Sequence, residues 1–129
     1  MPNSAPPPTL TAFLDGEIDN GSFRHVDHVR IGFELLDGHP FPAAAAMFSS
    51  ALKKIAAQHN PAAYHETITL AFLSLIAERR TVTGCAAFED FLRANSDLLD
   101  RHLLARWYTP ERLSSSLARR TFVLPEPAR

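Results

Sequence analysis

The segment Ala62–Arg80, AAYHETITLAFLSLIAERR, constrains the fold more than any other part of the chain. Its apolar residues cover most of the circumference of a helix, and such a helix has to be buried on most sides. Asn60 and Pro61 come directly before it and are typical of a helix N-terminus, where asparagine caps and proline takes the first helical position. We therefore expect a central helix from about residue 61 to residue 80.

Further segments have apolar residues at helical spacing. They are residues 23–37, 43–59, a shorter segment around 88–92, a stretch from 96 to about 104, and a last helix that begins at Thr109-Pro110-Glu111. We expect Asn20 or Ser22 to cap the first of these helices, and only a short helical turn around residues 10–14. The chain shows no repeat, no coiled-coil heptads and no series of alternating strand patterns. These signals predict an all-α fold, an irregular bundle of four or five helices.

The two ends of the chain differ in composition from the rest. Residues 1–9 hold four of the ten prolines among small polar residues, so we expect a disordered Pro-rich N-terminal tail. The closing TFVLPEPAR has an apolar run between a helix and two prolines, which predicts a short extended C-terminal segment across the bundle surface. Residues 10–129 are then expected to form a single helical domain, a common size for one domain.

Charge and cysteine content bear on partners and compartment. The formal net charge is −1 with both signs interspersed, which favours neither nucleic acid nor an anionic membrane as partner. Cys85 is the single cysteine and cannot form an internal disulfide, and the N-terminus has no signal-peptide pattern. We therefore expect a cytoplasmic protein.

Histidines at helical spacing mark the candidate site. His25 and His28 are one turn apart on the first long helix, and His65 and Glu66 lie early in the central helix. If the two helices cross, these four side chains could converge on a divalent transition metal such as Fe, Cu, Zn or Mn, because imidazole and carboxylate ligands bind such ions in helical bundles.

Two nearby residues are predicted to contact a cofactor or a small-molecule ligand. They are Tyr64, beside His65, and Arg30, on the same helix as His28. Chemistry on a small molecule is the function we expect from this site.

Other interpretations of the same residues stay open. His65 could be a core residue whose ring is hydrogen-bonded to a backbone carbonyl or to Glu66, and the histidines could serve metal-free acid–base chemistry. The chain lacks the Glu-x-x-His pairs of di-iron bundles, His-Glu-x-x-His and zinc-type Cys/His spacing. Leu70 and Leu73, opposite His65 on the central helix, suggest instead a non-catalytic interaction module or homodimer. Whether the protein is an enzyme is left undecided.

The chain also contains three short sequence patterns. They are the H-x-x-H-x-R pattern within Phe23–Arg30, the Y-H-E-T pattern within Tyr64–Thr69, and a closing pattern from Arg106-Trp107-Tyr108 to Phe122-Val123-Leu124-Pro125. Together they resemble a family of small bacterial all-α proteins of unassigned function, over about residues 22–125. The resemblance implies a helical fold and a recurring histidine patch, and it implies no reaction.

Overall fold

The computed structural model describes residues 9–18 and 23–127, and within them it contains α-helices, short 3-10 helices and no strand. The helices are α1 Leu10–Leu14, α2 His25–Gly38, α3 Phe41–His59, η2 Pro61–Ala63, α4 Glu66–Thr83, α5 Phe88–Ala94, η3 Ser96–Leu99, η4 Leu103–Arg106, α6 Pro110–Ser114 and α7 Ser116–Arg120. The all-α prediction is confirmed. None of the described helices combines the length and the apolar character needed to cross a membrane.

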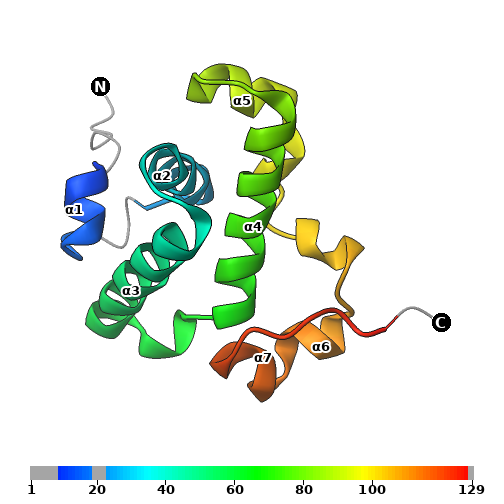
Figure 1. The fold of residues 1–129 in the computed structure, drawn as a ribbon. Helices are drawn as coiled ribbons and strands as arrows, with labels where there is room; N and C mark the ends of the chain where they lie inside the picture. Colours follow the sequence, from blue (N-terminus) through cyan, green and yellow to red (C-terminus); the bar gives the residue numbers. More distant parts are fainter. Residues whose placement is uncertain (1–8, 19–22, 128–129) are drawn as a thin grey trace, which may run out of the picture.

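Helix α4 lies between α1–α3 on one side and the C-terminal elements on the other (Figure 1). It packs closely against α2 at Gly32, where a Cβ atom would lie 3.0 Å from Cδ1 of Ile76 and 3.1 Å from Cδ1 of Leu73. Both of these side chains belong to α4, so the two helices approach one another at a position where only a hydrogen fits without displacement. This crossing sets the position of α2 beside the central helix.

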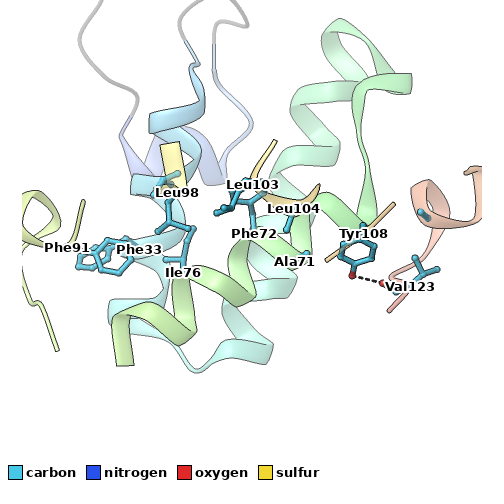
Figure 2. Packing of buried hydrophobic residues seen from close by; sticks show 12 residues of the cluster. Phe33, Ala71, Phe72, Ile76, Phe91, Leu98, Leu103, Leu104, Tyr108 and Val123 are labelled. Carbon is cyan, nitrogen blue, oxygen red and sulfur yellow. Dashed lines mark hydrogen bonds between the residues drawn. The ribbon is translucent and has the colours of Figure 1, made fainter. Parts of the chain in front are cut away.

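Buried side chains form two clusters, and α4 contributes residues to both. The first cluster joins α1, α2 and α3 to Leu73, and in it Phe13 of α1 is fully buried with its ring centroid 5.6 Å from that of Phe48. The expected short turn at the N-terminus is therefore a firmly packed helix. The second cluster includes Phe33, Phe91 and residues of the C-terminal half (Figure 2).

The C-terminal segment, residues 121–127, is extended and contains no strand, as predicted. The Thr67 hydroxyl in α4, which is fully buried, donates to the carbonyl of Thr121 at 2.9 Å and accepts from the amide of Val123 at 3.1 Å. The Tyr108 hydroxyl donates to the carbonyl of Val123 at 2.7 Å (Figure 2). The Thr67 hydrogen bonds hold the segment against the start of α4, and the third ties it to Tyr108.

The central helix begins at Glu66, so the predicted start near residue 61 is wrong. Pro61–Ala63 forms a single 3-10 turn, and Tyr64 and His65 then have extended backbones. The His65 side chain accepts a hydrogen bond from the amide of Ile68 and is thus the N-cap of α4. A ring nitrogen here takes the role usually filled by a side-chain oxygen.

Three other boundaries differ from expectation. The stretch from Ser96 forms two 3-10 helices, and the last helix is divided because the Ser115 hydroxyl accepts from the amide of Ala118 and starts α7. The first long helix begins at His25, where the amide of Arg24 donates to Asp27 Oδ2 at 2.8 Å. The predicted caps at residues 20 and 22 lie outside the described residues, as do residues 1–8 of the predicted tail. The last residue of that tail, Thr9, caps α1.

Candidate functional site

A cavity of about 670 Å³ lies between α2, α3 and α4, and we call it the central cavity. Two helices supply its apolar walls at helical spacing, α3 through Phe48, Leu52 and Ile55 and α4 through Ile68, Phe72 and Ile76. The three histidines predicted at the site all line it as well. His25 and His65, which are 40 positions apart in the sequence, thus line the same cavity.

His25 is the first residue of α2 and joins that helix to the C-terminal half. Its Nε2 lies 2.8 Å from the carbonyl oxygen of Leu98 in η3, and because a carbonyl only accepts, Nε2 carries the proton. The ring meets Phe72 edge-on with a centroid distance of 5.1 Å. His25 therefore connects α2 to η3 at the central cavity.

His28 follows one turn later and is half-buried. Its ring centroid lies 4.2 Å from that of Phe23 and 6.3 Å from that of His25. Burial, and to a smaller extent the nearby His25, lower the pKa of His28 to about 4, while Asp27 acts in the opposite direction. The ring is consequently neutral at pH 7, with one nitrogen as donor and the other as acceptor.

Both ring nitrogens of His65 are used by the fold. Nδ1 accepts from the amide of Ile68 at 3.1 Å, which leaves the proton on Nε2, and Nε2 donates to the carbonyl of Leu113 at 2.7 Å. The interpretation of His65 as a buried residue bonded to a backbone carbonyl is confirmed. To bind a metal, His65 would have to give up one of these two hydrogen bonds.

Tyr64 and Glu66 form a pair beside the cavity. Tyr64 lines the cavity, and its hydroxyl donates to Glu66 Oε1 at 2.5 Å. Burial and this hydrogen bond raise the pKa of Tyr64 well above its usual value. The Glu66 carboxylate also lies 3.8 Å from the Lys53 ammonium, and Glu66 is not among the lining residues of the cavity.

Arg30, the other predicted ligand contact, forms ion pairs on α2. It pairs with Glu34 at 3.3 Å and with Asp27 at 3.7 Å, and it is not a lining residue. Among residues 9–18 and 23–127, no three side chains from His, Cys, Asp and Glu are grouped so as to hold a metal ion. The four-ligand metal site, and with it Fe, Cu, Zn or Mn as cofactor, stays a prediction.

Two arginines at the cavity were not predicted from the sequence. Arg24 precedes α2, and Arg101 lies in the turn between η3 and η4. No aspartate or glutamate of the described ranges is among the lining residues, so both charged groups that line the cavity there are cations. Arg101 follows His28 by 73 residues, and contacts such as the hydrogen bond between His25 and Leu98 bring its segment to the cavity.

The leucines that suggested a docking surface have another role. Leu73 is fully buried in the cluster that joins α4 to α1, α2 and α3, and Leu70 is half-buried. The helix face on which the interaction hypothesis rested is therefore largely part of the core. Dimerisation and partner binding stay predictions without that support.

No protein-family model matches the chain, and neither a curated protein nor a solved structure is significantly similar to it. The family resemblance of the three sequence patterns thus stays a prediction. What the site can do has to be argued from its own residues.

Proposed function

We propose that this protein binds a small molecule in the central cavity. The observation that carries the proposal is the cavity itself: its volume of about 670 Å³ falls within the range of about 300–1,000 Å³ that is usual for ligand pockets. Its walls are mainly apolar side chains with a few polar groups, which is the usual composition of such pockets. The apolar walls would supply affinity, and the polar groups would orient the ligand.

His28 is the polar group best suited to contact the ligand. His25 and His65 each donate to a backbone carbonyl, whereas the His28 ring makes no hydrogen bond to any other described residue. As a neutral imidazole it offers one donor and one acceptor to a bound molecule. A hydroxyl, amide or carbonyl group on the ligand could use either.

The test is a fluorescence titration with N-phenyl-1-naphthylamine, a neutral apolar probe that becomes brighter in apolar surroundings. Ala56 on α3 lines the cavity and Ala57, its neighbour, is exposed and does not, so Ala56→Phe and Ala57→Phe form a matched pair. We expect saturable binding to the wild type and to Ala57→Phe, and binding at least about tenfold weaker to Ala56→Phe, a loss of roughly 1.4 kcal/mol.

Circular dichroism would show that both variants are folded before their affinities are compared. No saturable binding to the wild type, or equal affinity in the two variants, would contradict the proposal.

A divalent transition metal at the same histidines is a second candidate. It is supported by the position of His25 and His28 in one cavity, with ring centroids 6.3 Å apart. A metal that binds only the folded state raises the melting temperature by mass action. We expect such a rise with Fe, Cu, Zn or Mn and its loss in His28→Ala; no rise with any of the four would reject this candidate.

A further inference from the structure

The charged residues of the central cavity indicate which class of molecule it takes. Both are guanidinium groups, those of Arg24 and Arg101, and within residues 9–18 and 23–127 no carboxylate lines the cavity. A cavity with charge of one sign attracts ligands of the opposite sign and disfavours those of the same sign. The protein as a whole has a net charge of −1, so the positive charge that would attract an anion is local to the cavity.

The two arginines belong to segments of the chain that are in contact with each other. Arg24 directly precedes His25, whose ring binds the carbonyl of Leu98, and Arg101 follows Leu98 by three residues. The hydrogen bond between His25 and Leu98 thus joins the two segments that carry the guanidinium groups. An anionic group near this contact could be bound by residues of both segments.

Arg101 is the stronger candidate of the two. The Arg24 Nε lies 3.6 Å from the Asp27 carboxylate, so part of its charge is already balanced. Arg101 is exposed and forms no ion pair with any residue of the described ranges. Its planar guanidinium can donate two parallel hydrogen bonds to a carboxylate, sulfonate or phosphate.

The apolar walls define the rest of the ligand. Ile68, Phe72 and Ile76 follow one another along one face of α4 and span about 12 Å at 1.5 Å per residue. α3 faces them with Phe48, Leu52 and Ile55. A ligand that fills this space needs an apolar body of similar length.

We infer that the ligand is an amphipathic organic anion, with an apolar aliphatic or aromatic body between α3 and α4 and its anionic group bound by Arg101 with help from Arg24. This inference rests on the proposed function and names the ligand class for the same site.

Two related probes test it, because 8-anilinonaphthalene-1-sulfonate is N-phenyl-1-naphthylamine with one added sulfonate. We expect the wild type to bind the sulfonate at least about tenfold more tightly than the neutral probe, and Arg101→Gln to remove most of that preference. The affinity of Arg101→Gln for the neutral probe should stay within twofold of the wild type. Arg120→Gln is the control, since Arg120 is exposed and does not line the cavity.

The outcomes separate the two proposals. If the neutral probe does not bind, or Ala56→Phe binds it like the wild type, the proposed function fails and the inference fails with it. If the neutral probe binds in the cavity but the sulfonate binds no more tightly, the inference alone is overturned. It is also overturned if Arg101→Gln and Arg120→Gln weaken sulfonate binding equally, because the charge effect would then be general.

Discussion

Replacing His28 by glutamine should change how the stability of the protein depends on pH. In the folded chain the pKa of His28 is about 4, against an ordinary value of 6.5 in the unfolded chain. A base whose pKa is lower in the folded state takes up its proton preferentially on unfolding. Above pH 6.5 His28 is neutral in both the folded and the unfolded state, so its titration does not lower the free energy of unfolding. Between pH 6.5 and pH 4 the free energy of unfolding falls as the pH falls.

The size of the effect follows from the two pKa values. A pKa difference of about 2.5 corresponds to a loss of about 3 kcal/mol when the pH falls from 7 to 4. Other groups titrate over the same interval, so only the difference between variants isolates His28. His25, which helps to lower this pKa, and Asp27, which opposes it, are unchanged in the variant.

Urea unfolding at pH 7, 6, 5 and 4 would measure this difference. We expect the wild type and the exposed control His102→Gln to lose about 3 kcal/mol more than His28→Gln between pH 7 and pH 4. If His28→Gln loses as much stability as the wild type over this interval, the His28 ring is not held in a neutral, desolvated environment. The role proposed for it in ligand binding would then lose its physical basis.

Three substitutions in the scaffold give further predictions, each measurable by urea unfolding. Thr67→Val should cost about 2–3 kcal/mol because it leaves a buried amide and carbonyl of the C-terminal segment unpaired, whereas Thr81→Val, exposed on the same helix, should cost less than about 0.5 kcal/mol. Tyr108→Phe should cost about 1 kcal/mol through its lost hydrogen bond. Gly32→Val should cost about 1–3 kcal/mol because the added side chain overpacks against α4, whereas Gly38→Val meets open space and should not carry this cost. Equal costs for Thr67→Val and Thr81→Val, or for Gly32→Val and Gly38→Val, would contradict the packing described.

The long helices could be predicted because their signals are local. In α2 and α3 apolar residues recur at helical spacing over several turns, and the observed ranges of 25–38 and 41–59 begin within two residues of the predicted starts. The start of α4 was missed because Asn60 and Pro61 imitate a helix N-terminus, while the actual cap is His65. A histidine cap depends on a ring orientation that is stabilised by the distant carbonyl of Leu113, and no sequence window of helix length contains both residues.

The candidate site was predicted in part. The spacing of His25 and His28 and the apolar surroundings of His65 pointed to one location, and all three line the central cavity. Glu66, the first residue of α4, contacts Lys53 and Tyr64 and is not a lining residue, so its part in a metal site stays a prediction. Arg101 could not be predicted, because a lone arginine in a turn has no periodic signal and reaches the cavity only through tertiary packing.

An NMR titration of isotope-labelled protein with N-phenyl-1-naphthylamine tests most directly whether the central cavity is the binding site. We predict that the largest chemical-shift changes occur at the His28 ring and at the methyl groups of Leu52 and Ile68, all of which line the cavity. The account would be contradicted if the His28 ring were unaffected and the changes were concentrated at exposed apolar residues that do not line the cavity, such as Leu117 and Phe122.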